Sequence, residues 1–291
     1  ILWQPTQKEI EKTELTNFAN WVKKHCGFDW ARRYENLWSW SVEYPDLFWE
    51  AIWQWHGVIG KKGKRILIDK DKLPGAQFFP DDHLNFAENL LRNASNEIAL
   101  SSHHENGKIE TLTRKKLKEN VAALAGWMRS QGLCKGDRVA AYIPNIQQSV
   151  VAMLAASSLG AIYSSCSPDF GFNGVFDRFS QIEPKLLITV DGYFYAGQKI
   201  SRINIIRELK EKIPSLVHVL VHDYLGNATD LISEKDISLY SNALKHPPLQ
   251  EFVPVKFNDP LYILYSSGTT GAPKCIVHSV GGTLLQHIKE H

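Results

Sequence analysis

The chain has 291 residues, of which 44% are apolar and 22% charged, and its formal net charge is +2. This length allows one large domain or two, and the composition is typical of globular domains. So small a net charge argues against a nucleic-acid partner or a membrane surface and leaves at most a weak preference for anionic ligands.

The four cysteines form no CxxC pair or other metal-ligand spacing, and we expect reduced, mostly buried thiols. No signal peptide is visible at the N-terminus, which lacks an initiator methionine, so residues upstream are expected. The longest apolar stretch, "VVAMLAASSLGAIY", is shorter than the roughly 20 residues that span a bilayer. By elimination we expect a cytoplasmic protein of the cytosol, without a membrane partner.

The first 90 residues are predicted to form a helical extension rich in tryptophan. Eight of the nine tryptophans lie before residue 56. Pro45 suits a first helical turn, and Phe48, Ile52 and Trp55 follow at helical spacing. These aromatic residues are better explained by packing than by a ligand-binding aromatic box. The charged stretch 61–83, with its glycines and prolines, resembles a linker.

A different pattern begins after residue 90. Residues 96–113 predict a hairpin that turns at Glu105-Asn106-Gly107, which would leave His103 and His104 exposed near its tip. Thr113 can cap a helix that Gly132 ends.

Strands and helices then alternate up to residue 222. The apolar patterns predict strands at 138–143, 161–165, 185–190 and 216–222, with helices at 147–160, 173–184 and 199–214 between them. Such alternation favours right-handed βαβ units and a mostly parallel sheet. His218 and His222 share one face of the last strand and are interpreted as partly exposed strand residues. Residues 223–260 look irregular and polar.

The string "YSSGTTGAPKCIVHS", from Tyr265 to Ser279, follows the apolar run 261–264. Glycines allow close backbone approach to a phosphate, hydroxyls add donors without bulk, and Lys274 adds a positive charge. The string therefore predicts a loop between two strands that holds a polyphosphate. It is not a Walker loop, because Pro273 stands where that motif requires glycine. The alternative is a flexible Ser/Gly surface turn.

Tyr265 to Lys274 resembles the signature loop of the acyl-adenylate-forming (AMP-binding) family, which includes acyl-CoA synthetases, firefly luciferase and peptide-synthetase adenylation domains. Each position meets the pattern of an aliphatic or aromatic residue, Ser/Thr-Ser-Gly-Ser/Thr-Thr-Gly, one variable residue and Pro-Lys. The tryptophan-rich entry and the strings "LNFAENLL" and "SPDFGFNGVFDRFSQIEPKLLI" resemble the acetoacetyl-CoA synthetase branch, and this resemblance covers nearly the whole chain.

The resemblance implies an α/β fold, the doubly wound βαβ sheet of the adenylate-forming N-terminal domain, truncated here. Residues 1–90 would be the extension, and residues 91–291 an incomplete adenylation domain. The implied reaction is that of an ATP-dependent acid–thiol ligase, which activates acetoacetate as its acyl-AMP and transfers it to coenzyme A (CoA).

Site residues are carried over from the family on the same resemblance. Lys274 would be catalytic, and Mg²⁺ would be shared with the phosphates, without metal ligands from this chain. The β- and γ-phosphates of ATP would be wrapped by Ser266, Ser267, Gly268, Thr269, Thr270 and Gly271.

The CoA site is expected at "YAGQK". Acetyl-CoA synthetases place two arginines around this Ala-Gly pair to meet the 3′-phosphate. Here Tyr195 and Gln198 occupy those places, and the adjacent Lys199 could substitute as a point charge.

Other motifs that the family needs do not occur in this sequence: the aromatic-Gly-x-Thr-Glu segment whose glutamate holds magnesium, the ribose-binding aspartate, the hinge and the lysine of the C-terminal lid. We therefore expect an N-terminal portion that is inactive without its own C-terminal portion. Two alternatives stay open. One is a synthetase for acetate or propionate, against which "SPDFGFNG" argues, and the other is a truncated, non-catalytic regulatory or binding protein.

Overall fold

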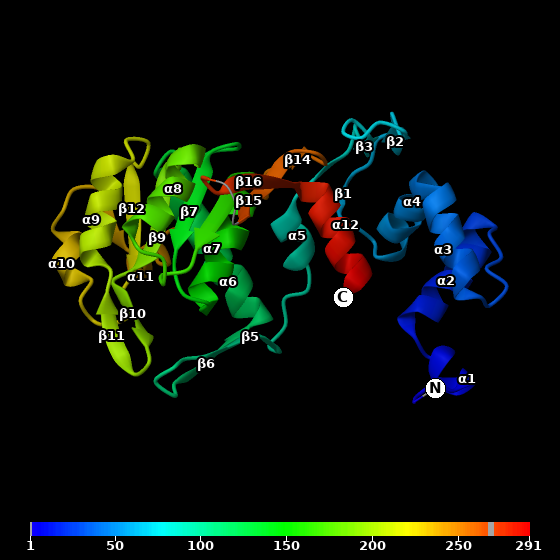
Figure 1. Cartoon of the computed structure of the whole chain (residues 1–291), viewed down its shortest axis with the longest axis horizontal. Coiled ribbons are helices and arrows are strands. Elements are labelled where there is room, and N and C mark those ends of the chain that lie inside the picture. The colour runs from blue at the N-terminus through cyan, green and yellow to red at the C-terminus, as the bar shows by residue number, and fades with distance from the viewer. Residues whose placement is uncertain (1, 267–270) are drawn as a thin grey trace.

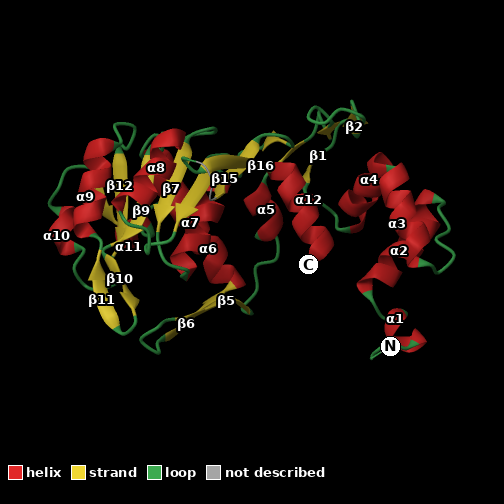
Figure 2. Cartoon of the chain, viewed as in Figure 1, coloured by secondary structure: helices red, strands yellow, loops and turns green. Residues whose placement is uncertain are grey.

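The computed structural model describes residues 2–266 and 271–291. Figure 1 shows a lobe built on a sheet at one end and a helical lobe, formed by the start of the chain, at the other. The segments between them include the helix that ends the chain. In Figure 2 the strands gather in the first lobe, whereas the second is almost entirely helical.

The helical lobe is held together by aromatic side chains. Its helices are α1 (Gln7–Ile10), α2 (Glu14–Cys26), α3 (Tyr34–Glu43) and α4 (Pro45–Trp55). Trp40 is buried, stacks on Phe28 at 5.1 Å between ring centroids, and meets the edge of Phe48 at 6.0 Å. Pro45 opens α4, as its sequence position predicts. The predicted helices and their aromatic packing are confirmed.

Part of the stretch that resembles a linker packs into the core, whereas residues 69–77 are exposed. It contains four strands of two residues each, β1 (Gly60–Lys61), β2 (Leu67–Ile68), β3 (Gln77–Phe78) and β4 (His83–Leu84), and α5 (Phe86–Leu90) follows. Phe79 is fully buried, with its ring centroid 5.2 Å from that of Trp53 and 4.8 Å from that of Phe257. The linker interpretation is therefore wrong here, because aromatic contacts hidden in the charged pattern fix the segment.

A seven-stranded sheet forms the centre of the other lobe. All neighbouring strands are parallel except the last pair, in which β16 returns antiparallel to β15. In spatial order the strands are β13 (Ile237–Leu239), β12 (His218–His222), β9 (Leu186–Val190), β7 (Arg138–Tyr142), β8 (Ile162–Cys166), β15 (Pro260–Ser266) and β16 (Lys274–Ser279).

Helices cover both faces of this sheet. Val139 and Ala141 of β7 belong to the core that includes α6 (Arg114–Ser130) and α7 (Gln147–Ser158). Ala140 and Tyr142 belong to the core that includes α8 (Phe172–Ile182) and α9 (Ile203–Lys212). Alternate residues of a strand face opposite sides, so the doubly wound α/β fold is confirmed.

The remaining elements lie around this framework. They are the β5 (Ile98–His103) and β6 (Ile109–Thr113) hairpin, the β10 (Gly192–Tyr195) and β11 (Gln198–Ser201) hairpin, α10 (Thr229–Ile232), α11 (Tyr240–Ala243), β14 (Val255–Lys256) and α12 (Val280–Glu290). Among the helices of the described residues, none is long and apolar enough to cross a membrane.

Four local predictions need correction. Three of the four cysteines are exposed, Cys26, Cys134 and Cys275, so the expectation of mostly buried thiols is wrong. The helix predicted over 199–214 begins only at Ile203, because residues 198–201 form β11. Residues 223–260 are not simply irregular, since β13 extends the sheet by pairing with β12. His104 is not an exposed turn residue: its side chain is only 3% exposed, with Nδ1 2.8 Å from the Tyr224 hydroxyl and Nε2 3.0 Å from Glu110 Oε2.

Candidate functional site

The predicted phosphate loop follows the carboxyl end of β15, which pairs in parallel with β8. In open α/β sheets, ligands bind beyond the carboxyl ends of such strands. Ser266 ends β15 and lies directly opposite Lys274, the first residue of β16. Of the predicted phosphate-binding residues, Ser267, Gly268, Thr269 and Thr270 lie outside the described residues.

The described flank of the loop has the features that a phosphate contact requires. Lys274 is exposed, so its ammonium group is accessible to a ligand. Gly271 has φ of 142°, a conformation that residues with a Cβ rarely adopt, and a Cβ built there would meet no heavy atom of the described residues within 4 Å. Glycine is therefore required here for conformational reasons.

Helix α8 contacts both sides of this segment. The Tyr265 hydroxyl donates to the main-chain oxygen of Arg178 at 3.2 Å and lies 3.1 Å from the Ser164 hydroxyl. Burial raises the pKa of Tyr265, so its phenol remains a donor across the physiological range. On the other side, Gln181 Nε2 donates to the main-chain oxygen of Pro273 at 3.0 Å. One helix thus contacts the chain before Ser266 and just before Lys274.

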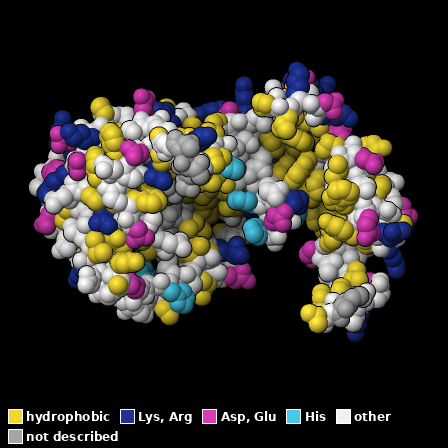
Figure 3. Space-filling model, in the orientation of Figure 1, with side chains coloured by type: hydrophobic (Ala, Val, Ile, Leu, Met, Phe, Trp, Pro, Cys, Tyr) yellow, Lys and Arg dark blue, Asp and Glu magenta, His cyan; other side chains and the backbone are white. Residues whose placement is uncertain are grey.

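A second cation lies close to Tyr265. The Arg178 guanidinium lies over the Phe170 ring at 4.6 Å and over the Tyr265 ring at 5.7 Å, and Nη1 donates to the main-chain oxygen of Gly174 at 2.6 Å. On the face drawn in Figure 3, basic and acidic side chains are interspersed over the sheet-containing lobe. Attraction of a phosphate to the loop therefore depends on nearby groups such as Lys274 rather than on a broad positive field.

The three residues predicted to bind CoA lie on the β10–β11 hairpin. Tyr195 pairs across the strands with Gln198, and the preceding pair is Phe194 with Lys199. Successive pairs face opposite sides of a hairpin, so Tyr195 and Gln198 share one face and Lys199 lies on the other, with its Nζ 6.0 Å from the Phe194 ring centroid. Lys199 therefore does not occupy the face on which the two substituted residues meet.

This hairpin lies apart from the phosphate loop. It extends from the end of β9, away from β15 and β16 in Figure 1. Its base is fixed by Asp191, whose fully buried carboxylate accepts main-chain hydrogen bonds from Tyr224, Leu225 and Asn227 at 2.8 to 2.9 Å. The structure therefore groups the described phosphate-loop residues in one place and the CoA candidates in another.

No metal centre emerges from the described residues, in which no group of three or more His, Cys, Asp or Glu side chains is placed to hold an ion. The described flanks contribute one hydroxyl and one ammonium, from Ser266 and Lys274. Such a donor set suits a phosphate and does not by itself fit magnesium, which prefers carboxylate and phosphate oxygens.

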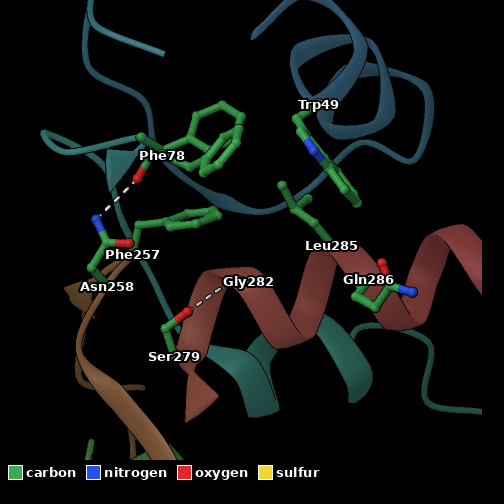
Figure 4. A pocket seen from close by; sticks show the side chains of 9 residues that line it. Trp49, Phe78, Phe257, Asn258, Ser279, Gly282, Leu285 and Gln286 are labelled. Atoms are coloured by element: carbon green, nitrogen blue, oxygen red, sulfur yellow. Dashed lines mark hydrogen bonds between the residues drawn. The ribbon is translucent and has the colours of Figure 1, made fainter. Parts of the chain in front are cut away.

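A cavity against α12 is distant from the loop and has a different character. It encloses about 230 Å³ at the opposite end of β16 from Lys274, against α12. Figure 4 shows Trp49, Phe78, Phe257 and Leu285 as its apolar walls, with Gln286 at one side. None of its lining residues is titratable, so it offers no acid–base group for catalysis.

Sequence reasoning missed the residues that support both segments. Gln181, Ser164 and Asp191 act through contacts with residues distant in the sequence, and no local pattern marks Gln181 or Ser164. The one available signal was the position of Asp191, a charged residue directly after a fully buried strand.

Comparisons with known proteins agree with this fold. The model of the family described as AMP-binding enzyme matches residues 86–290. The chain is 42% identical to the acetoacetyl-coenzyme A synthetase of Rhizobium meliloti (strain 1021) and 42% identical to the acetoacetyl-CoA synthetase of Xenopus tropicalis, covering all of this chain and 45% of each relative. A solved acetoacetyl-CoA synthetase from Streptomyces lividans superimposes with a TM-score of 0.94 at 39% identity, covering 99% of this chain and 45% of that one. The chain thus spans less than half the length of these relatives.

Proposed function

The chain belongs to the AMP-binding enzymes, and on this basis we propose that it is the N-terminal, ATP-phosphate-binding portion of an acetoacetate–CoA ligase. The observation that carries the proposal is the β15–β16 hairpin, which places Ser266 opposite Lys274 beyond the carboxyl end of a parallel strand. Acetoacetate as the acid follows from the names of the relatives and from the string "SPDFGFNG".

In the proposed first step, a carboxylate oxygen of acetoacetate attacks the α-phosphorus of ATP. The bond from that phosphorus to the bridging oxygen breaks, which gives the acyl-adenylate and pyrophosphate. Backbone N–H groups and hydroxyls from Ser266 to Gly271 would hold the β- and γ-phosphates, including those of Ser267, Gly268, Thr269 and Thr270. Lys274 would stabilise the negative charge that the leaving pyrophosphate gains.

In the second step, the sulfur of CoA attacks the acyl carbon and AMP leaves, while the thiol proton is lost. Tyr195 and Gln198 on one face of the β10–β11 hairpin, and Lys199 on the other, are the proposed contacts for the nucleotide end of CoA. Mg²⁺ neutralises phosphate charge when it is bound. Because the described residues offer it no ligand cluster, it would depend on the phosphates and on residues of the longer protein.

Two further statements are proposals of the same kind. Residues 1–90 would form the extension, and residues 91–291 the incomplete adenylation domain. The protein would act in the cytosol on small molecules, and residues 1–291 would need their own C-terminal portion for turnover.

The test is turnover of the full-length protein with acetoacetate, acetate and propionate at equal concentrations. We expect pyrophosphate, AMP and acyl-CoA to form in equal amounts, fastest with acetoacetate, and no turnover by residues 1–291 alone. A preference for acetate or propionate would support the short-chain alternative. Absence of acid-dependent pyrophosphate release by the full-length protein would support the non-catalytic alternative.

A further inference from the structure

Gln181 makes three contacts from the exposed side of α8. Its Nε2 lies 3.0 Å from the main-chain oxygen of Pro273 and 2.5 Å from that of Asp177, and its Oε1 accepts from Cys275 Sγ at 3.6 Å. Pro273 and Cys275 flank Lys274. One amide side chain therefore contacts the chain on both sides of the proposed catalytic lysine.

A second set of contacts fixes the strand that leads into the loop. The buried Ser164 hydroxyl lies 2.8 Å from the main-chain oxygen of Ile263 and 3.1 Å from the Tyr265 hydroxyl. Tyr265 in turn donates to the main-chain oxygen of Arg178 in α8. The strand before the loop is therefore tied to β8 and to the same helix that carries Gln181.

Helix α8 is a firm support for these contacts. Val175 and Phe179 are fully buried, and Ile182 is 7% exposed, in the core on one face of the sheet. A helix anchored by such a face moves little relative to the sheet. Arg178 and Gln181 lie within about one helical turn of each other, so Tyr265 and Pro273 are both held against the same turn of α8.

We propose that Gln181, on α8, is a positioning residue that sets the direction of Lys274 through Pro273 and Cys275. This inference rests on the proposed function, since it assigns to Gln181 a role in binding ATP. In this role Gln181 touches no reacting atom. Its role is to limit the positions that the Lys274 backbone adopts, so that the ammonium group meets the phosphates without a reorganisation cost.

The decisive variant is Gln181→Met in the full-length protein, because methionine has similar length and lacks the donor. Gln181→Lys restores a donor toward Pro273. The matched control is Gln250→Met, because the exposed Gln250 also donates from Nε2 to a proline carbonyl, that of Pro248, at 3.0 Å. The readouts are KM for ATP and for CoA, the rate of acid-dependent ATP–pyrophosphate exchange, and amide hydrogen exchange over residues 271–276.

For Gln181→Met we expect KM for ATP to rise about threefold to tenfold, which matches the net contribution of one hydrogen bond. Amide exchange over residues 271–276 should rise by a similar factor, while KM for CoA stays unchanged. Gln181→Lys should recover most of both losses, and Gln250→Met should change neither.

Unchanged amide exchange in Gln181→Met would overturn the inference, because it would show that Gln181 does not hold the segment. Faster amide exchange with an unchanged KM for ATP would also overturn it. Equal increases in KM for ATP and KM for CoA would do the same. Failure of the proposed function would be seen differently, in the absence of acid-dependent activity from the unmodified protein. In that case amide hydrogen exchange over residues 271–276, together with the affinity for ATP measured by calorimetry, still decides whether Gln181 positions Lys274.

Discussion

The phosphate loop and the β10–β11 hairpin both follow strands of one sheet, but they are held in different ways. Side chains of α8 and β8 contact the chain on both sides of the loop. The hairpin is held near its base by Asp191, by Arg202, which donates to the Tyr193 hydroxyl at 2.9 Å, and by the packing of Phe194 on Tyr224. Only its tip is free of such contacts, where Tyr195 is 60% exposed.

This difference matters for the two ligands. A lysine whose neighbouring residues are held from outside can present its charge in one geometry, which benefits a reaction in which charge develops on phosphates. An exposed hairpin gives adaptable contacts of small individual strength, which suits binding of a distant part of a long substrate. We therefore expect mutations at the loop to change the rate of the first step and mutations at the hairpin to change KM for CoA.

The largest effect is expected for Lys274→Ala in the full-length protein. Removing one preorganised group that faces developing charge typically lowers the rate by about 10²–10³. Because backbone N–H groups remain, we expect the rate of acetoacetate-dependent ATP–pyrophosphate exchange to fall by about 10². Lys274 is exposed, so stability should change by no more than about 0.5 kcal/mol.

Lys115→Ala is the control for this variant, because Lys115 is equally exposed on α6. Lys115→Ala should leave the rate of ATP–pyrophosphate exchange unchanged. A large fall in melting temperature for Lys274→Ala would mean that the lysine has a structural role, and the comparison of loop and hairpin would then fail.

A smaller effect is expected for Gly271→Ala, which we predict lowers the rate of ATP–pyrophosphate exchange about tenfold. The matched control is Gly107→Ala at the tip of the β5–β6 hairpin, where φ is 81° and an added Cβ likewise meets no heavy atom of the described residues within 4 Å. Both substitutions should cost about 1–3 kcal/mol of stability, since both force a residue with a Cβ to a positive φ. If the two variants lose activity equally, the effect is one of general stability and not of phosphate binding.

At the hairpin we expect Lys199→Ala to raise KM for CoA about twofold to fivefold, as for one exposed charge contact, and to leave KM for ATP unchanged. Tyr195→Arg should tighten CoA binding modestly or leave it as it is. Lys115→Ala again serves as the control. Equal changes in both KM values would show that the hairpin does not distinguish CoA from ATP.

The smallest effect concerns pH and β12, whose end contacts the hairpin region. Burial lowers the pKa of His222 and outweighs the opposing charge of Asp191. A folded-state pKa below the unfolded value favours the neutral imidazole, so stability is complete above the unfolded pKa of about 6.5 and is lost as the pH falls below it.

We expect the melting temperature to fall between about pH 7.5 and pH 5.5, and His222→Phe to reduce this fall. The reduction should be partial, because burial also lowers the pKa of His56 and His287. An unchanged pH dependence in His222→Phe would show that this histidine is already protonated or solvated in the fold.

The sequence predicted the loop because its chemistry is local: hydroxyls, glycines and a lysine lie within ten residues after an apolar strand. It predicted the alternating strands and helices for the same reason, since the apolar stretches of β7, α7, β8, α8 and β9 are separated by local signals such as Pro144 and Gly160. The hairpin was missed because residues 198–201 form a strand only by pairing with residues 192–195.

His104 shows the same limit of prediction from local sequence. Its place beside a turn indicates exposure, and only the fold brings Tyr224, 120 residues later, against its ring. Gln181 and Ser164 are comparable, because ordinary polar residues acquire a role from a partner that is distant in the sequence.

The most direct test of the central claim is a structure of the full-length protein with a non-hydrolysable ATP analogue. We predict that the β- and γ-phosphates lie against the chain between Ser266 and Gly271, with Lys274 Nζ within hydrogen-bond distance of a phosphate oxygen. Phosphates bound elsewhere, with Lys274 directed into solvent, would contradict the account.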